Sequence, residues 1–246
     1  MSDKLASLVA DTSATLARVA ADFGPAVFAS SLAAEDMVLT DLILKAKLPI
    51  RIFSLETGRL HPETLAMLER VKAHYDGYEI AVYRPQQEAV DAYVAQNGLN
   101  AFYDSVEMRK ECCRIRKVEP LGRALKGNKA WVTGQRRAQS ATRAELHVQE
   151  HDAAHGMEKF NPLADWSEQD VWDYIRANGV PYNALHDQGY PSIGCEPCTR
   201  AIEPGEDVRA GRWWWENPDS KECGLHMVDG KLIRIKSVPA YIGKIQ

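Results

Sequence analysis

The sequence contains no apolar run that approaches the ~20 residues of a membrane-spanning helix. The N-terminus, Met1–Lys4, leads into alternating apolar and polar residues, without the apolar core of a signal peptide. Cysteine is scarce, and its count of five is odd, which is typical of reduced thiols in the cytosol. We therefore expect a cytoplasmic protein with no membrane partner.

An excess of either charge is also missing. The chain has 30 Lys and Arg residues against 34 Asp and Glu residues, for a net charge of −4. This balance gives no global preference for nucleic acid, so we expect no nucleic-acid partner. Internal repeats and low-complexity segments are absent as well. With 45% hydrophobic residues in 246, we expect a single α/β domain over residues 1–246.

Glycine is missing from the segment Ser30–Asp36, which reads Ser-Ser-Leu-Ala-Ala-Glu-Asp between a predicted strand and a predicted helix. A loop that cradles a triphosphate with its backbone normally needs glycines for close approach. The hydroxyls of Ser30 and Ser31, with free N–H groups at a helix start, can still bind an anion. Simple capping of the helix is the alternative. The segment therefore favours a smaller or differently charged group than ATP.

Hydrophobic periodicity predicts the fold. Apolar residues at helical spacing predict an opening helix over Leu5–Ala21. Short apolar runs predict buried strands at Ala26–Ser30, Ile50–Leu55, Tyr78–Tyr83 and Ala130–Thr133. Helical patterns separate or follow these runs at Glu35–Lys45, Pro62–His74 and Gln86–Gln96. The alternation predicts a parallel twisted sheet with helices on both faces, whose ligands bind beyond the carboxyl ends of the strands.

The last third of the chain has a different composition. A helix-start signal lies at Ser167–Asp170, and Gly, Pro and aromatic residues dominate from Pro181 onward. We expect a loop-rich C-terminal portion that folds over the strand ends. Residues 216–246 are expected to form a mobile arm.

Basic side chains gather in three clusters. Arg136, Arg137 and Arg143 follow the Thr133-Gly134 turn after a buried strand. The other two clusters are Arg114, Arg116 and Lys117, and Arg209 and Arg212. A solvated charged face would explain any one of them. Together they suggest convergence on an anionic ligand, for which arginine is well suited. Thr57-Gly58-Arg59 is also placed at a strand's carboxyl end, where it can contact a nucleotide.

Four of the cysteines form two tight pairs, Cys112-Cys113 and Cys195-x-x-Cys198. The second spacing is common in both zinc and iron–sulfur sites. Adjacent cysteines point to opposite faces of a strand and about 100° apart on a helix, so a shared centre must sit against a helix or bend at residues 112–113. This favours a bulky cubane cluster over zinc. Buried packing thiols are the alternative.

The fifth cysteine has a different neighbourhood. Cys223 lies between Glu222 and Gly224, with His226 three residues later. An imidazole can stabilise a thiolate or take part in proton transfer. We interpret Cys223 as a nucleophile that the C-terminal arm delivers to a site and then presents to a partner. A chance surface cysteine is the alternative.

Taken in order, these motifs resemble the assimilatory sulfonucleotide reductases, specifically the bacterial adenylyl-sulfate (APS) reductases. The resemblance runs from about residue 25 to 226 and implies the adenine-nucleotide α-hydrolase fold. The motifs that carry it are Ser30–Asp36, Thr57–Leu60, Cys112-Cys113 with Lys117, Trp131–Arg137, Asn161–Leu163 with Trp166 and Asp170–Trp172, Cys195–Cys198, Gly205–Trp215 and Glu222–His226. Glu56 departs from the aspartate that is usual before Thr-Gly-Arg.

The resemblance implies thioredoxin-dependent reduction of APS to sulfite and AMP through an S-sulfocysteine on Cys223. It places a [4Fe-4S] cluster on Cys112, Cys113, Cys195 and Cys198. It places the phosphosulfate on Lys117, Arg209, Arg212 and His226. The remaining nucleotide contacts fall on Ser30, Ser31, Thr57, Arg59, Gly134 and Arg136. A homo-oligomer is expected. The tail after His226 has no second cysteine pair, so we expect no fused thioredoxin-like domain.

Rival functions remain open at this point. A phosphoadenylyl-sulfate (PAPS) reductase belongs to the same family, although relatives restricted to PAPS commonly lack the cluster cysteines. An ATP pyrophosphatase of related fold is disfavoured by the glycine-free turn. A zinc module that binds nucleic acid through its basic clusters is the third alternative.

Overall fold

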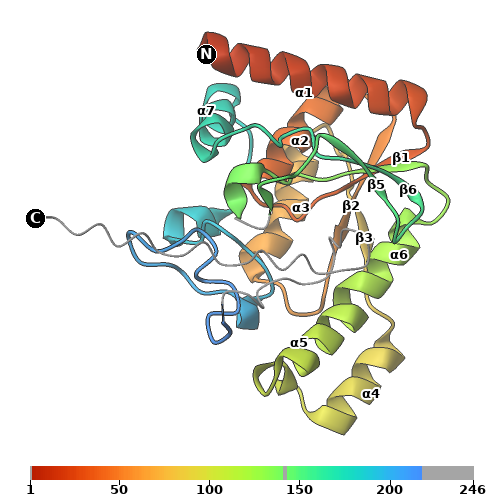
Figure 1. The fold of residues 1–246 in the computed structure, drawn as a ribbon, viewed down its shortest axis with the longest axis vertical. Helices are drawn as coiled ribbons and strands as arrows, with labels where there is room; N and C mark the ends of the chain where they lie inside the picture. The colour runs from red at the N-terminus through yellow and green to blue at the C-terminus, as the bar shows by residue number, and fades with distance from the viewer. Residues whose placement is uncertain (1, 141–142, 218–246) are drawn as a thin grey trace, which may run out of the picture.

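The computed structural model describes residues 2–140 and 143–217, so Cys223 and His226 lie outside the described residues. A six-stranded sheet with the order β3-β2-β1-β4-β6-β5 forms its centre (Figure 1). The strands are β1 (Ala26–Ala29), β2 (Ile50–Leu55), β3 (Ala81–Tyr83), β4 (Ala130–Val132), β5 (Gln149–Asp152) and β6 (Met157–Phe160). Neighbouring strands run parallel except β5 and β6. The expected α/β class is confirmed, with the correction that the outer strand β5 is antiparallel.

Side chains of the central strands alternate between two apolar layers, as the pleat of a strand requires. Phe28, Ile52 and Val132 lie in the layer that packs against α1 (Asp3–Asp22), α2 (Ala34–Lys45), α3 (Pro62–His74) and α7 (Glu168–Asn178). Val27, Phe53 and Trp131 lie in the layer that packs against α6 (Glu119–Leu125). Helices therefore cover both faces, and the strands read as continuous apolar runs.

Helix boundaries follow local capping. The Ser167 hydroxyl accepts a hydrogen bond from the Asp170 N–H at 3.2 Å, and the Asp170 carboxylate accepts from the Ser167 N–H at 2.9 Å. This reciprocal cap begins α7, as expected from the sequence. Pro62 stands at the first turn of α3. The helix after β3, α4 (Gln87–Asn97), is followed by the C-cap residue Gly98, whose φ is 90°.

The sequence did not reveal every element. β5 was missed because its residues, Gln-Glu-His-Asp, contain no apolar side chain. α5 (Val106–Cys113) was missed because its buried residues are Arg109 and Cys113, so no apolar face marks it. A π-helical turn, Arg114–Val118, joins α5 to α6. β3 begins at Ala81 rather than at Tyr78.

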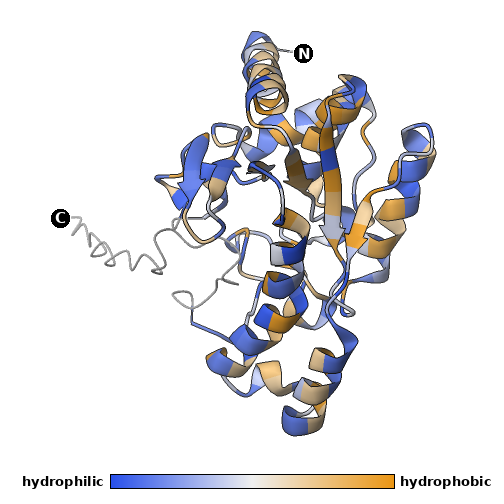
Figure 2. Cartoon of the chain, turned by 90° about the vertical axis from the view of Figure 1, so that its right-hand side faces the viewer, coloured by the Kyte–Doolittle hydropathy of each residue, from blue (hydrophilic) through white to orange (hydrophobic). Residues whose placement is uncertain are grey.

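The segment after α7 has little regular structure apart from short 3₁₀ turns, Ala184–Gln188 and Glu196–Cys198, as expected. It reaches the carboxyl ends of the strands, where Leu60 forms an isolated bridge with Cys195. A second bridge joins Thr199 to Arg212 within the segment. Figure 2 shows the apolar central strands between helices with mixed faces. None of the helices in the described ranges has the length and apolar character needed to cross a membrane.

Candidate active site at the carboxyl ends of the strands

A cavity of about 250 Å³ opens where β1, β2 and β4 end. Ser30 and Ser31 line it from the end of β1, Thr57 from the end of β2, and Gly134 from the end of β4. The loop-rich segment completes the wall with residues 191–194, 208–209 and 212–213. Because β1 lies between β2 and β4 in the sheet, the connections after β1 and β4 diverge here. Ligands of open α/β sheets bind at such a point.

Hydrogen-bond donors in the turn between β1 and α2 bind a carboxylate of the protein itself, that of Asp36. Asp36 accepts hydrogen bonds from the Ser31 N–H at 2.6 Å and from the Ser31 hydroxyl at 2.5 Å. The backbone of Gly134 also hydrogen-bonds to Asp36. In this turn buried Leu32 adopts the left-handed backbone conformation, with a φ of 65°, which a glycine would usually adopt. The N–H groups that we expected to meet an anion of the ligand therefore meet groups of the protein: the Ser31 N–H meets Asp36, and the Ala34 N–H meets His186.

Burial raises the pKa of Asp36 to about 6, against the opposing hydrogen bonds from Ser31. The folded state therefore holds the proton more tightly than an unfolded chain, in which the pKa is 3.8. Stability contributed by the neutral acid is complete below pH 4 and is lost as the pH rises to about 6. Across this window the cost of ionising Asp36 reaches about 3 kcal/mol.

The first prediction follows from this cost. Asp36→Asn, which cannot ionise, is expected to be more stable than the wild type at pH 7.5. The advantage should shrink toward zero at pH 4, where Asp36 itself is neutral. Urea unfolding at both pH values measures the difference. An advantage of equal size at both would show that packing, rather than ionisation, sets the cost.

Arg136 is not among the residues that line the cavity, and the nucleotide contact expected for it stays a prediction. Its buried guanidinium pairs with Glu35 at 2.7 Å, and Gln139 donates to the same carboxylate at 2.9 Å. A buried arginine is accounted for by this partner from α2. Arg59 also points elsewhere: it donates to the Leu99 carbonyl at 3.3 Å and lies over the Phe102 ring.

Cations also line the cavity. Lys117, Arg143, Arg209 and Arg212 all reach it. That Lys117, Arg209 and Arg212 hold an anion stays a prediction. The Arg212 guanidinium donates to the Ile193 carbonyl at 3.1 Å and lies 4.7 Å from the centre of the Trp213 ring. Gly194 is needed beside it, because a Cβ there would come within 2.5 Å of the Arg212 guanidinium. The loop backbone thus fixes the direction of this arginine.

The cysteine pairs come together next to the cavity. Cys195 and Cys198 are buried with Phe102 and Trp213, and Cys112 packs against this group. Cys113 ends α5 and acts electrostatically on Cys198. Residues 112–113 form the end of α5, which continues directly into the π-helical turn. No group of three or more Cys, His, Asp or Glu side chains in residues 2–140 and 143–217 is arranged to hold a single metal ion.

Lys117 links the cysteines to the cavity. Burial opposes ionisation of the Cys195 thiol, but the Lys117 ammonium, the Thr57 hydroxyl and Arg212 outweigh it and lower the pKa of Cys195. The Thr57 hydroxyl lies 3.2 Å from the Cys195 sulfur. Burial raises the pKa of Cys198 to about 12. Of these thiols, the one that Lys117 contacts is the easiest to ionise.

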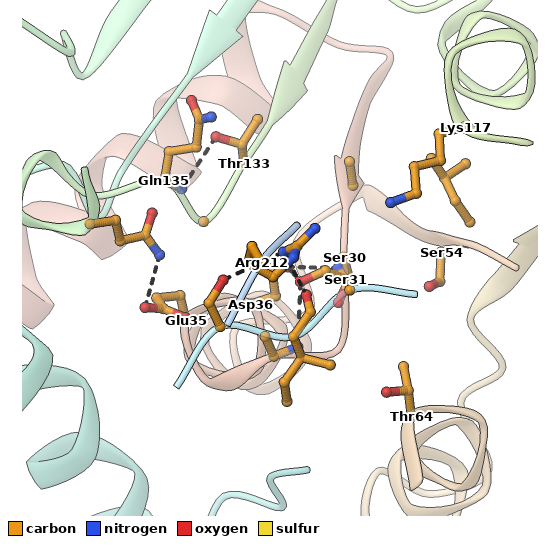
Figure 3. A pocket seen from close by; sticks show the side chains of 18 of the residues that line it. Ser30, Ser31, Glu35, Asp36, Ser54, Thr64, Lys117, Thr133, Gln135 and Arg212 are labelled. Atoms are coloured by element: carbon orange, nitrogen blue, oxygen red, sulfur yellow. Dashed lines mark hydrogen bonds between the residues drawn. The ribbon is translucent and has the colours of Figure 1, made fainter. Parts of the chain in front are cut away.

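Figure 3 shows Glu35 and Asp36 on one side of the cavity and Lys117 on the other, with Ser54 and Thr64 along the wall. Sequence reasoning did not single out Ser54, Thr64 or the carboxylate of Asp36. Ser54 carries a usable signal, because it lies near the carboxyl end of a predicted strand. Thr64 carries none, because its position depends on how α3 packs.

Comparison with known proteins identifies relatives of this chain. A family model described as the phosphoadenosine phosphosulfate reductase domain matches residues 25–201. An adenosine 5′-phosphosulfate reductase of Burkholderia cepacia is 64% identical over 92% of this chain and 90% of its own length. The enzyme of that name from Allochromatium vinosum is 63% identical over 86% of this chain and 82% of its own length.

Solved structures agree with this placement. A phosphoadenylyl-sulfate reductase from Candida auris, in a phosphate complex, has a TM-score of 0.66 at 27% identity and covers 82% of this chain and 98% of its own. An FMN adenylyltransferase from Candida glabrata has a TM-score of 0.57 at 15% identity, with 93% of this chain and 82% of its own covered, which shows the fold alone. With a family model over most of its length and close relatives over nearly all of it, this chain belongs to the phosphoadenosine phosphosulfate reductase family, among the adenosine 5′-phosphosulfate reductases.

Proposed function

We propose that this protein reduces adenylyl sulfate (APS) to sulfite and AMP in assimilatory sulfate reduction, with thioredoxin as the reductant. The observation that carries the proposal is the place of Lys117. Its side chain lines the cavity at the strand ends and also acts on Cys195, one of the gathered cysteines. A site with this arrangement, in a chain of this family, is suited to a nucleotide that carries a strongly anionic group at its reacting end. The cytoplasm, where thiols are kept reduced, is the compartment that fits this reductant.

The reaction balances with Cys223 as the nucleophile. Its thiolate attacks the sulfur of APS, the sulfur–oxygen bond to the phosphate breaks, and AMP leaves with the electron pair. An S-sulfocysteine remains on the enzyme. A thioredoxin thiolate then attacks the Cys223 sulfur and releases sulfite, and the second thioredoxin thiol resolves the mixed disulfide. Both electrons come from the dithiol, which ends as a disulfide.

Cavity residues assist by neutralising charge. Lys117, Arg209 and Arg212 line the cavity and would hold the phosphosulfate, with His226 of the C-terminal arm. Donors fixed in advance stabilise charge that develops on a leaving group, and each is typically worth ~2.7–4 kcal/mol. Arg212 meets this requirement because Ile193 and Trp213 hold its guanidinium in place.

The cysteine group fits a [4Fe-4S] cluster better than a zinc ion. Four thiolates around one zinc, at ~2.3 Å from the metal, must converge on a point. Here Cys112, Cys195 and Cys198 pack in one group with Cys113 acting on Cys198, and no such convergence is found within residues 2–140 and 143–217. A cubane uses a separate iron for each thiolate, so its ligands stand farther apart. Cys112, Cys113, Cys195 and Cys198 would hold it. A bound cluster would supply a fixed local charge beside Lys117, not the electrons of the reaction.

Sulfite release tests the proposal directly. Anaerobically purified protein with thioredoxin should form sulfite from APS. Equal or faster release from PAPS would favour the alternative reductase of the same family. ATP hydrolysis without sulfite release would favour a pyrophosphatase. A colourless, zinc-loaded protein would contradict the cluster. The homo-oligomeric state stays a prediction, which light scattering can measure.

A prediction for Lys117 separates its role from general charge. Lys117→Ala is expected to lower kcat with APS by about 10²–10³, as for loss of a fixed donor at a reacting group. The matched control is Lys110→Ala, because Lys110 is exposed on the same helical segment. Steady-state kinetics with iron analysis measures both variants. Equal losses in the two, or a loss that only follows iron content, would contradict a role in the reaction.

A further inference from the structure

The carboxylate of Asp36 fills a place where proteins of this layout can bind an anion. Donors converge on it from the ends of two strands: the Ser31 N–H at 2.6 Å, the Ser31 hydroxyl at 2.5 Å and the backbone of Gly134. Backbone N–H groups at such a strand end form a nest for phosphate. A Cβ on Gly134 would collide with the carboxylate, so the fit is close. We call this place the Asp36 nest.

The next free N–H of the helix start is also taken. Ala34 donates to the His186 imidazole nitrogen Nε2 at 3.1 Å, and His186 lies on the 3₁₀ turn Ala184–Gln188. Burial lowers the pKa of His186, which keeps the imidazole neutral and able to accept. The start of α2 therefore offers its backbone donors to the protein itself, and an anionic ligand would have to displace these side chains.

A structural role alone does not account for the charge at position 36. An acidic side chain in the first turn of a helix interacts favourably with the helix dipole, but Glu35 already provides such a side chain in α2. Glu35 is neutralised by Arg136 at 2.7 Å, whereas Asp36 has no ion pair within residues 2–140 and 143–217. A buried carboxylate without a cation is costly, and a serine or asparagine could accept the same hydrogen bonds.

The cavity wall carries charges of both signs. Asp36 lies on one side of it, and Lys117 lies on the other (Figure 3). Arg143, Arg209 and Arg212 add positive charge to the wall. A phosphate near the nest would meet a like charge in a buried site, whereas a phosphate near Lys117 would meet cations.

We propose that Asp36 is a specificity-determining residue, which fills the nest so that the cavity accepts an adenine nucleotide with its anion on the Lys117 side and rejects nucleoside triphosphates. The inference rests on the proposed function, since it concerns the site that would hold APS. ATP shares its adenosine with APS, so a repulsive element is an effective means of discrimination.

Nucleotide binding tests the inference without turnover or reductant. Calorimetry at pH 8 compares ATP with AMP for the wild type and for Asp36→Asn, which keeps the shape and removes the charge. ATP affinity should rise by at least about tenfold in the variant, and AMP affinity by much less, because like-charge contacts in buried sites are strongly repulsive. The matched control, Glu88→Gln, removes the same charge from an exposed site on α4 and should change neither.

Unchanged ATP affinity in Asp36→Asn, or equal gains for ATP and AMP, would overturn the inference. If the asparagine variant does not fold, the same binding measurement is made with Asp36→Ser. Because binding is measured separately from sulfite release, a protein that fails to reduce APS can still confirm or refute the role of Asp36. A wild type that binds ATP as tightly as AMP would also overturn it.

Discussion

Replacing Cys223 by serine is expected to abolish sulfite release while APS binding and iron content stay at wild-type levels. A serine hydroxyl is a far weaker nucleophile than a thiolate at neutral pH. A sulfated serine would also lack the sulfur–sulfur bond that a thioredoxin thiol cleaves to release sulfite. The wild type, mixed with APS in the absence of thioredoxin, should gain the mass of one sulfonate group on Cys223. Intact-protein mass spectrometry and peptide mapping measure this directly.

The outcome depends on a division of the cysteines between two tasks. Cys112, Cys113, Cys195 and Cys198 lie together in the described part of the chain, and Cys223 lies beyond it. Loss of iron in Cys223→Ser would assign Cys223 to the metal group instead. Sulfite release by this variant, or a sulfonate found on any other residue, would rule out its role as the nucleophile.

The second large effect concerns the ion pair of Arg109 and Glu216. Arg109 donates to both carboxylate oxygens of Glu216 at 2.8 Å, and the two side chains are only 0% and 3% exposed. Arg109 also lies 4.6 Å from the centre of the Trp213 ring. Arg109→Ala is expected to cost about 3–5 kcal/mol of unfolding free energy, because it leaves a buried carboxylate without its cation.

The same helix region provides a matched control. Arg114 pairs with Glu111 in the same two-pronged manner, but these side chains are 59% and 43% exposed. Arg114→Ala should cost no more than about 1 kcal/mol. Urea unfolding of both variants under anaerobic conditions gives the comparison. Similar losses in the two would mean that burial does not govern the strength of the Arg109 pair.

Strands β1, β2 and β4 could be predicted from the sequence because their residues are mostly apolar, as in Ile50–Leu55, but β6 has charged residues at its centre and was not predicted. Strand β5 could not, because it lies at the edge of the sheet and its residues are polar. α5 was equally hidden, since its buried face consists of an arginine and a cysteine that only tertiary partners make favourable.

The candidate site could be predicted where chemistry leaves a local mark. Paired cysteines and a lysine at fixed spacing are enough to identify the region around Lys117. Arg136 shows the limit of such reasoning: a cluster of arginines indicates anions, but the anion that meets Arg136 is Glu35, 101 positions earlier in the chain. Asp36 shows the converse, because a carboxylate at a helix start looks like a cap until its surroundings are known.

The π-helical turn after α5 determines which side of the helix carries Lys117. In a regular α-helix, residues five apart stand about 140° apart around the axis, so Lys117 would face away from Cys112. In a π turn, residues five apart come onto the same side. Lys117 accordingly acts on Cys112 as well as on Cys195. The extra residue in this turn changes the angle around the helix axis, so that one short stretch of backbone places the Cys112 thiol and the Lys117 ammonium on the same side.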